Sequence, residues 1–452
     1  MAITRIFDMS QRSLATYQKA LDVTAHNVAN ASNPDYARQK VSFTSVSPDN
    51  IGDFSLGAGV KIDQISRIKD DYLEKSILGN NSKYSANQKK STLLNRVEGY
   101  FMELSGAGIS DSLNEFFNSW SELSTSPTSL PLRNNIVTSA QKLTSVVTDF
   151  NENIDTMRNE VFDEFNQNVD EVNQNLKNLY DINLKIAESK GTKVGINDLL
   201  DQRDKTIQSL SKQGNLTVKF NDNGVANVSI GGVAASNSYG ATQFVVGIKD
   251  DKLTMVTSEE GNAALLKEGE LSALSEVYSK VIPENKENFN AMIAAMATAV
   301  NSEHQNGRTL SNPPVTGISF FSEYENGKLK INQDILSDAN MIAASLTNTD
   351  GNGDNALKIA ELFDKKIYNN RTISESYSSM VSSIGNEAKL TENLADANKL
   401  ILDQLESRRS EISAVSVDEE MTNILTYQRS YDASAKLIKV ADELLQTIIN
   451  LV

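Results

Sequence analysis

The two histidines are the first residues to weigh as catalytic groups, because the chain contains no others. Nucleophilic catalysis needs a histidine that an acid orients beside a nucleophile. The sequence places neither His26 nor His304 in such a group, and they stand far apart. An isolated histidine is weak evidence for chemistry. We therefore expect His26 and His304 to cap or pack near the ends of their helices.

A short acidic loop matches a calcium-binding loop in part. An EF-hand loop takes oxygen ligands from positions 1, 3, 5 and 12 and has a glycine at position 6. The four ligand positions are occupied by Asp350, Asn352, Asp354 and Glu361. Asn355 replaces the glycine, and residues 355–363 read as a helix that Asp354 would cap. The sequence therefore favours a turn with a helix cap over a calcium site.

Glu419 and Glu420 are adjacent acids that could be considered as a catalytic pair. Glycoside hydrolysis needs two carboxyl groups separated in space, which neighbours on one helix cannot provide alone. Acidic residues in a first turn complement the helix dipole and are solvated. We expect Glu419 and Glu420 to open a helix. The sequence predicts no enzyme and no catalytic, cofactor or metal site, and the absence of cysteine excludes thiolate ligands and disulfides.

The composition is that of a globular protein, with 39% hydrophobic residues. Its 43 basic and 59 acidic residues give a net charge of −16. This charge argues against nucleic-acid and anionic-membrane partners, because both need a cationic surface. No stretch approaches the ~18 consecutive apolar residues of a membrane span, so no membrane insertion is expected. The first residues lack an unbroken apolar core and a small-residue cleavage site, so no cleaved signal peptide is expected.

Long amphipathic helices are predicted at both ends of the chain. The first has apolar or small residues in steps of three and four, at Ile3, Phe7, Ser10, Leu14, Tyr17, Leu21, Ala25 and Val28. The last has Met421, Ile424, Tyr431, Ala435, Ile438, Leu445, Ile449 and Val452 on a heptad register, widened by Leu437, Val440, Leu444, Ile448 and Leu451. Such stripes must be buried, so we expect the ends to pair. The predicted assembly interface consists of Leu14, Tyr17, Leu21, Val28, Ile424, Tyr431, Ile438, Leu444, Leu445, Ile448 and Ile449.

The middle of the chain reads as long helices with a β-rich insert. Residues 131–188 contain no glycine and no internal proline, and their apolar positions have a mean step close to 3.6. Further helices are predicted at about 67–104, 110–124, 196–212 and 270–304, with a break at Pro283, and again from about 354. Alternating residues predict strands between 213 and 265, and short strands between 305 and 345. Another apolar stripe consists of Leu390, Leu394, Ala397, Ile401, Leu405, Ile412 and Val415.

The fold predicted from these elements is mainly α and elongated. The terminal helices pair in a coiled-coil-like rod, long helices form a bundle in the middle, and the β-rich insert is small. The predicted terminal assembly domain comprises residues 1–65 with 400–452. The predicted long-helix domain comprises residues 66–212 with 266–304 and 346–399. The predicted outer subdomain comprises residues 213–265 with 305–345.

Four short segments stand in a fixed order along the chain. They are residues 27–39 around an Asn-Pro turn, 197–204, 301–304 followed by Gly307, and 417–436 with an Asp-Glu-Glu opening. Together with the helical ends, they resemble the bacterial flagellar axial family of rod, hook and hook-associated proteins. The Arg38-Gln39 pair and the Asp-Glu-Glu opening are most similar to hook-associated proteins of the hook–filament junction. The similarity covers roughly residues 1–40, 130–210, 285–320 and 350–452.

The resemblance implies a structural role, with assembly of the chain as a ring that joins hook to filament. The implied partners are further copies of the chain, the hook protein below, a second junction protein above, and a cytoplasmic export chaperone on the C-terminal helix. The implied location is extracellular, after export through the flagellar type III apparatus.

Two alternatives stay open. The chain could be another axial protein of the hook or rod type, which a long β-rich middle would favour. It could also be a secreted enzyme or effector carried on flagellar-type ends, which a cluster of histidines and acids in the inserts would favour. The long helices and the short inserts argue against both.

Overall fold

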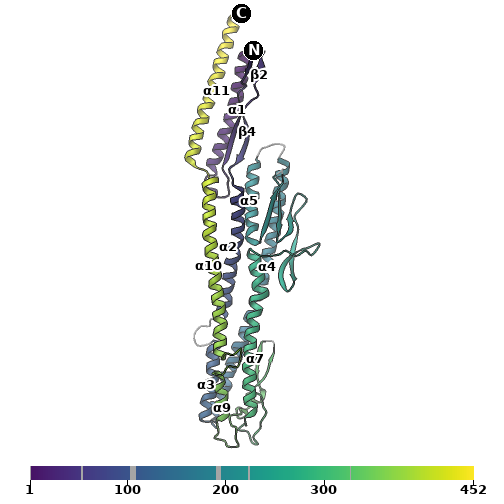
Figure 1. Ribbon diagram of the computed structural model, residues 1–452, viewed down its shortest axis with the longest axis vertical. Coiled ribbons are helices and arrows are strands. Elements are labelled where there is room, and N and C mark those ends of the chain that lie inside the picture. The colour runs from purple at the N-terminus through teal and green to yellow at the C-terminus, as the bar shows by residue number, and fades with distance from the viewer. Residues whose placement is uncertain are drawn as a thin grey trace.

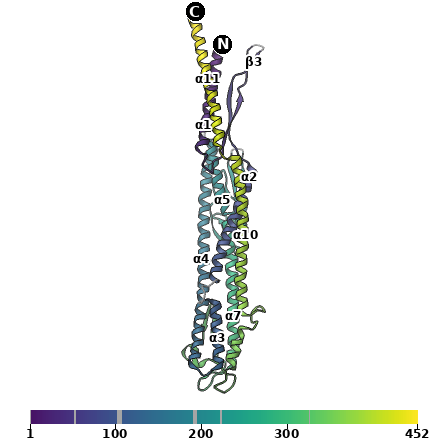
Figure 2. The same cartoon turned by 90° about the vertical axis from the view of Figure 1, so that its left-hand side faces the viewer.

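The computed structural model of the chain is a long rod in which most helices run along the axis (Figure 1). It describes residues 2–51, 54–101, 108–189, 195–221, 224–325 and 327–451. Both ends of the chain lie at one end of the rod, where α1 (Ala2–Ala29) and α11 (Val417–Leu451) run side by side (Figures 1 and 2). The predicted fold class, mainly α and elongated with paired terminal helices, is confirmed.

The terminal helices and the strands between them form one unit, here called the terminal unit (residues 2–70 and 414–451). Its strands are β1 (Gln39–Ser45), β2 (Asp49–Ile51), β3 (Phe54–Leu56) and β4 (Val60–Arg67). The pairs β1–β4 and β2–β3 are antiparallel. Helix α1 contacts α11 and also lies against β1 and β4, so it is the central element of the terminal unit.

The most buried positions of α1 and α11 are small or polar. They are Ser10, Thr16, Ala20, Thr24 and Asn27 on α1, and Glu420, Ser434 and Ala441 on α11. One aromatic group also links three elements, because Tyr427 of α11 lies 6.4 Å from Tyr17 of α1 and 5.7 Å from Phe43 of β1, between ring centroids.

The described residues between 71 and 413 form the body of the rod. Its helices are α2 (Asp71–Phe101), α3 (Ile109–Thr125), α4 (Leu130–Ser189), α5 (Ile196–Gln213), α6 (Glu270–Glu276), α7 (Ile282–Asn306), α8 (Gln333–Ser337), α9 (Asp354–Ala360) and α10 (Ile373–Ser413). A π-helical turn at Val277–Val281 joins α6 to α7, next to Pro283, and 3-10 turns lie at Ala339–Met341 and Glu361–Phe363. The 60 residues of α4 bury a residue on nearly every turn and run through the main hydrophobic core, as the helical period requires.

The strands of the body form small antiparallel sheets. They are β5 (Leu216–Phe220), β6 (Ala226–Ile230), β7 (Val233–Ser236), β8 (Phe244–Lys249), β9 (Lys252–Thr257), β10 (Phe321–Glu325) and β11 (Lys328–Ile331), in the orders β5-β6-β7, β8-β9 and β10-β11. Side-chain amides of α4 hold two of these strands. Asn183 exchanges two hydrogen bonds of 3.0 Å with the main chain of Ala226, and Asn173 exchanges two of 2.8 Å with that of Phe244. These amides replace a neighbouring strand as hydrogen-bond partners.

The terminal unit is not wholly helical, which corrects the prediction of a helical domain over residues 1–65. Helix α1 ends before Pro34, and residues 39–67 contain strands β1 to β4. Val41 with Phe43 and Val60 with Ile62 alternate with polar residues, but this alternation covers too few residues to predict the strands.

The two β-rich segments predicted to share one outer subdomain lie at different heights on the rod (Figure 1). Gly327, beside β11, accepts a hydrogen bond from Asn151 of α4, whereas β8 is bound by Asn173. These two asparagines are 22 positions apart on one helix, so their contacts are separated by about 33 Å. The predicted boundary at residues 399/400 also falls within α10, which ends at Ser413. The division into separate folding domains itself stays a prediction.

Helix α10 leaves part of its predicted apolar stripe exposed. Leu390, Leu394 and Ile401 are exposed. The residues it buries instead are Ile373, Ser376, Tyr377, Ile384, Ala388, Thr391, Ala395, Leu402 and Ser413. Helix α10 packs along α2. Its buried Thr391, Ala395 and Leu402 each follow an exposed apolar residue by one position, so the buried face is turned by one residue from the predicted stripe.

We expect amide hydrogen exchange to be slowest in α4 and faster in α1 and α11. Helix α4 runs through the main core, while the terminal helices bury few large apolar side chains. Low burial permits local opening at a small free-energy cost. Hydrogen exchange of the purified protein, followed by mass spectrometry, tests this order. Equal protection from end to end would contradict it.

Candidate functional site

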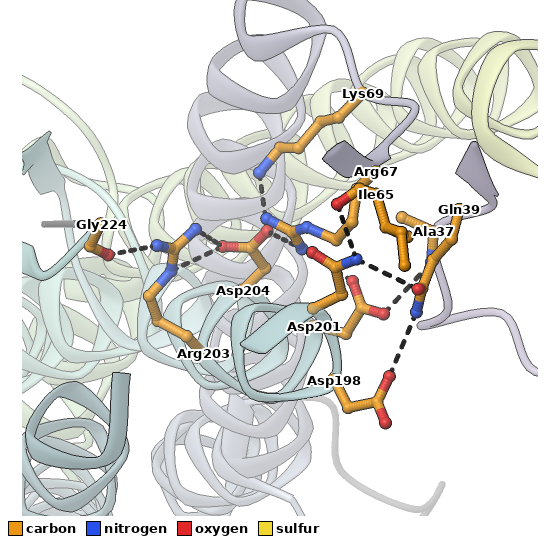
Figure 3. Close-up of polar contacts among 11 residues, drawn as sticks. Ala37, Gln39, Ile65, Arg67, Lys69, Asp198, Asp201, Arg203, Asp204 and Gly224 are labelled. Atoms are coloured by element: carbon orange, nitrogen blue, oxygen red, sulfur yellow. Dashed lines mark hydrogen bonds and ion pairs between the residues drawn. The ribbon is translucent and has the colours of Figure 1, made fainter. Parts of the chain in front are cut away.

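Three of the four segments named above meet where the terminal unit joins the body. The end of α1 and the loop after it carry residues 27–39, the first turns of α5 carry residues 197–204, and α11 begins at Val417. Figure 3 shows the side of this joint that faces α5. Segments that are distant in sequence thus form one continuous set of polar contacts.

Asn27, at the end of α1, is the centre of the first group of contacts. Its Oδ1 accepts hydrogen bonds from the main-chain N–H of Gln39 at 3.0 Å and from the Tyr36 hydroxyl at 2.7 Å. Its Nδ2 donates to the carbonyl of Gln39 at 2.8 Å and to Oε2 of Glu420 at 3.0 Å. The amide is 1% exposed, and it fixes the turn after α1 against both β1 and α11.

Arg38 binds both glutamates at the start of α11. Its Nη1 lies 2.6 Å from Oε2 of Glu419, and its Nη2 lies 2.6 Å from Oε1 of Glu420. Burial lowers the pKa of Arg38, but the hydrogen bonds to the two carboxylates outweigh this and raise it. Glu420 is 2% exposed, which corrects its predicted role as a solvated helix start. This ion pair within the terminal unit is called the arginine clamp below.

The second group of contacts crosses from the terminal unit to α5. Asp198, Asp201 and Asp204 form the acidic edge of α5, which faces β4 and the chain after it (Figure 3). Nη1 of Arg67 lies 2.7 Å from Oδ1 of Asp201 and 3.0 Å from Oδ2 of Asp204. Nζ of Lys69 lies 2.7 Å from the same oxygen of Asp204. Arg67 therefore contacts two carboxylates, and Asp204 contacts two cations of the terminal unit.

Arg203, which belongs to the body, is the third cation that contacts Asp204. Its Nη2 donates to Oδ1 of Asp204 at 2.6 Å, its Nη1 donates to the carbonyl of Gly224 at 2.6 Å, and its guanidinium lies 4.3 Å from the ring centroid of Phe220. Burial raises the pKa of Asp204, but Arg203, Lys69 and Arg67 outweigh it and lower that pKa to about 2. At Asp201 burial prevails over the nearby Arg67, and the pKa is raised. Asp204 is therefore the more firmly ionised carboxylate.

Amide and aromatic side chains make further contacts at the joint. Nδ2 of Asn197 donates to Oε1 of Gln39 at 3.1 Å and to the carbonyl of Ile65 at 3.3 Å. Gln39 in turn donates to Oδ1 of Asp198 at 3.3 Å. Nδ1 of His26 lies 3.1 Å from the Tyr36 hydroxyl. His26 thus has the packing role near a helix end that the sequence predicts.

This arrangement is suited to holding two parts of a molecule together. The carboxylates of Asp201 and Asp204 are used by cations of the same chain. Across the described residues, no group of three or more histidine, aspartate or glutamate side chains could hold a metal ion. The joint therefore consists mainly of ion pairs between the terminal unit and α5.

The fourth segment lies elsewhere, at the other end of the body. His304 of α7 is fully buried; its Nε2 accepts a hydrogen bond of 2.9 Å from the N–H of Ala343, and its Nδ1 lies 2.7 Å from the carbonyl of Ile318. Burial lowers the pKa of His304 to about 4. Asn301 holds the main chain of Phe321 by two hydrogen bonds of 2.8 Å. His304 therefore packs the chain, as predicted.

The acidic loop forms a turn before a helix. Helix α9 begins at Asp354, and its N-cap position is Gly353 rather than the predicted Asp354. Nδ2 of Asn352 donates to Oδ2 of Asp354 at 2.7 Å, and its Oδ1 accepts from the N–H of Leu346 at 3.0 Å. A side chain at position 353 would meet the carbonyl oxygen of Ser124, which explains the glycine there.

We expect no saturable calcium binding of micromolar affinity by this loop. Asn352 already uses both ends of its amide, and the helix from Asp354 places Glu361 on a separate turn. Isothermal titration of the purified protein with CaCl2 tests this. A micromolar site that is lost in both Asp350→Ala and Glu361→Gln would contradict the prediction.

The residues predicted for the assembly interface fall into two classes. Leu14, Tyr17, Leu21, Val28, Ile424, Tyr431 and Ile438 are half-buried in the terminal unit. Leu444, Leu445, Ile448 and Ile449 are exposed, as are Leu437 and Val440. The last turns of α11 extend beyond the start of α1 (Figures 1 and 2). We call Leu437, Val440, Leu444, Leu445, Ile448 and Ile449 the open stripe of α11. Val452 of the predicted register lies outside the described residues.

Sequence reasoning did not find Tyr36, Arg67 and Lys69. Arg67 and Asp201 are 134 positions apart, so no local pattern pairs them. The sequence analysis identified the Arg38-Gln39 pair and the Asp-Glu-Glu opening as separate features. Their contact could not be predicted, because it forms only when the C-terminal helix packs beside the N-terminal helix.

Two protein-family models match this chain. Residues 94–321 match the family model "Flagellar hook-associated protein FlgK helical domain", and residues 406–451 match "Flagellar basal body rod FlgEFG protein C-terminal". A relative named flagellar hook-associated protein 1 from Bacillus subtilis is 28% identical, and the match covers 98% of this chain and 97% of the relative. The protein of that name from Salmonella typhimurium is 19% identical over 99% of this chain and 100% of its own length.

A solved structure shares the fold. The flagellar hook junction protein FlgK from Burkholderia pseudomallei matches 75% of this chain and 100% of its own chain, with a TM-score of 0.65 at 13% identity. Among the described helices of the present chain, none is long and apolar enough to cross a membrane.

Proposed function

Because the chain belongs to the family of flagellar hook-associated proteins that the FlgK helical-domain model represents, we propose that it is a structural component of the bacterial flagellum that assembles as a ring at the hook–filament junction. The matched helical domain supports a hook-associated protein over a rod or hook protein. The rod-type match at residues 406–451 alone does not distinguish these classes. A structural role requires no catalytic residue, and we propose none.

The open stripe of α11 is the observation that supports assembly most strongly. Leu437 and Val440 are 46% and 50% exposed, and Leu444 and Ile448 are 45% and 49% exposed. A continuous apolar stripe on one helix is typical of a surface that another protein covers. Burial contributes about 25 cal/mol per Å² of apolar surface, before ordering costs are subtracted. Neighbouring copies of the chain are the proposed partners of this stripe.

The proposed partners beyond the ring are the hook protein below and a second junction protein above. Export through the flagellar type III apparatus would bring the chain to the tip, where it becomes extracellular. An export chaperone that covers the apolar face of α11 in the cytoplasm would keep this face from binding other surfaces.

Electron microscopy of cells that lack this protein tests the proposal. We expect hooks without filaments and flagellin released into the medium, both reversed by the wild-type gene. Cells that carry full-length filaments without the protein would refute the junction role. Cells that lack hooks as well would point to a rod or hook function instead.

A further inference from the structure

Arg133, in the first turn of α4, is a buried cation that binds main-chain carbonyls. It is 2% exposed. Its Nε donates to the carbonyl of Pro127 at 2.8 Å, and its Nη1 donates to those of Ile342 at 2.7 Å and Ala339 at 3.3 Å. Among the described residues, no carboxylate forms an ion pair with it. Burial lowers the pKa of Arg133 to about 10, which the more distant Asp338 only partly opposes.

The second terminal nitrogen of Arg133, Nη2, is the part of the guanidinium that these contacts leave unused. It carries two of the five N–H donors of an arginine. In the described part of the chain, Nη2 has no hydrogen-bond acceptor. It is also not one of the fully enclosed side-chain atoms that lack a partner, so it faces a space that a small ligand can reach. A buried charge without a counterion is costly, and such a ligand would reduce this cost.

A small cavity lies beside Arg133. Its walls come from α4, from the chain after α7 and from the loop before α9, at the end of the rod opposite the chain termini (Figure 1). Its volume is about 20 Å³. A cavity of this size holds one water molecule or one monatomic ion. It is too small to enclose a phosphate group or an organic ligand.

The charges around the cavity favour an anion. Arg308 also lines it and, among the described residues, has no ion pair. Asp350 lines the cavity as well but forms no ion pair with either arginine. The walls therefore carry two positive charges and one negative charge, in a chain whose net charge is −16. A local excess of one positive charge suits a monovalent anion better than a cation or an uncharged water molecule.

Uncharged donors complete the lining of the cavity. The hydroxyl groups of Thr347 and Thr349 line it and donate no hydrogen bond to another described residue. The amide group of Asn348 lies in the same wall. Hydroxyl and amide hydrogens can turn toward an anion, and hydrogen bonds to an ionised acceptor are stronger than neutral ones.

We propose that this cavity binds one chloride ion, held by Nη2 of Arg133 and by the guanidinium of Arg308. The ion neutralises the buried arginine and connects α4, the chain after α7 and the loop before α9. This site goes beyond the proposed function and does not depend on it. Its role is to stabilise the end of the body that lies farthest from the terminal unit.

Chlorine-35 NMR of the full-length protein in NaCl solution tests the site. Chloride that exchanges with a protein site gives a broader line than chloride in buffer. We expect wild-type protein to add an excess line width that saturates as NaCl is raised. Arg308→Gln removes one of the two cations. Arg133→Lys keeps the charge but loses the planar fork that serves the carbonyls and the cavity together.

The expected result is that both variants lower the saturable excess line width about fivefold, because each removes a charge-assisted hydrogen bond to the ion. The matched control is Arg371→Gln, which removes an exposed arginine that does not line the cavity. This control should keep the excess line width of the wild type. If Arg133→Lys does not fold, Arg308→Gln and its control decide the result.

Thermal unfolding of the same proteins gives a second measurement. A bound ion stabilises the folded chain by mass action, so replacing sodium gluconate with NaCl at about 0.15 M should raise the Tm of the wild type by about 2 °C more than that of Arg308→Gln. Comparing the two proteins removes the general effects of the two salts on stability.

Two results would overturn the chloride site. A wild-type protein without a saturable excess line width would mean that the cavity holds water. An excess line width that Arg308→Gln retains in full would mean that chloride binds elsewhere on the chain. Neither result bears on the junction role, which the cell experiment tests separately.

Discussion

Replacing Leu445 with aspartate will abolish incorporation into flagella and leave the isolated chain folded. Leu445 is 39% exposed in the open stripe, and a substitution at such a surface position changes the free energy of unfolding by about 0.5 kcal/mol or less. If a neighbouring subunit covers the stripe, the same aspartate becomes an unpaired buried charge, which costs several kcal/mol. The measurement compares thermal unfolding of the purified variant with filament counts in complemented cells.

The matched control for this prediction is Gln446→Asp, which adds the same charge at the next position. Gln446 is exposed and polar, and its amide contacts Asp442 of its own helix. We expect this control to support filaments. Full-length filaments in cells with Leu445→Asp would show that the last turns of α11 are not the assembly element.

Removing the arginine clamp should unfold the terminal unit and spare the body. In Arg38→Ala, Glu420 stays buried beside Asn27 without its cation, and breaking a buried ion pair in this way costs about 3 kcal/mol. Among its described residues, the terminal unit buries few large apolar side chains to offset this loss. Hydrogen exchange should therefore rise by more than tenfold in α1 and α11 and stay unchanged in α4.

The control for the clamp is Arg96→Ala, whose ion pair with Glu160 is at the surface. Exposed pairs contribute about 0.2–1 kcal/mol, so this variant should leave exchange in α1 and α11 as in the wild type. Equal exchange in Arg38→Ala and Arg96→Ala would mean that the clamp does not hold the terminal helices together.

The long helices could be predicted because a helix of many turns repeats its signal. The prediction for residues 131–188 differs by one residue at each end from α4, Leu130–Ser189. The absence of glycine and of internal proline predicted that this segment is helical. The 3.6-residue period of its apolar residues identified the buried face of the helix. The pairing of the chain ends followed from two complete stripes that needed a partner.

Other features were beyond the reach of periodicity. The strands at residues 39–67 are short and mostly half-exposed, so their alternation is weak. The exposed Leu390, Leu394 and Ile401 show that the largest apolar residues of a helix need not be the buried ones. At the joint, the sequence supplied Arg38, Glu419 and Glu420 but not their pairing, because ion pairs between distant segments depend on the completed fold.

Cryo-electron microscopy of the isolated hook–filament junction tests the central claim most directly. The account predicts that each copy of this chain keeps α1 paired with α11, and that Leu437, Val440 and Leu444 of the open stripe are buried by an adjacent subunit. A junction in which these side chains face solvent, or in which α11 is separated from α1, would contradict it.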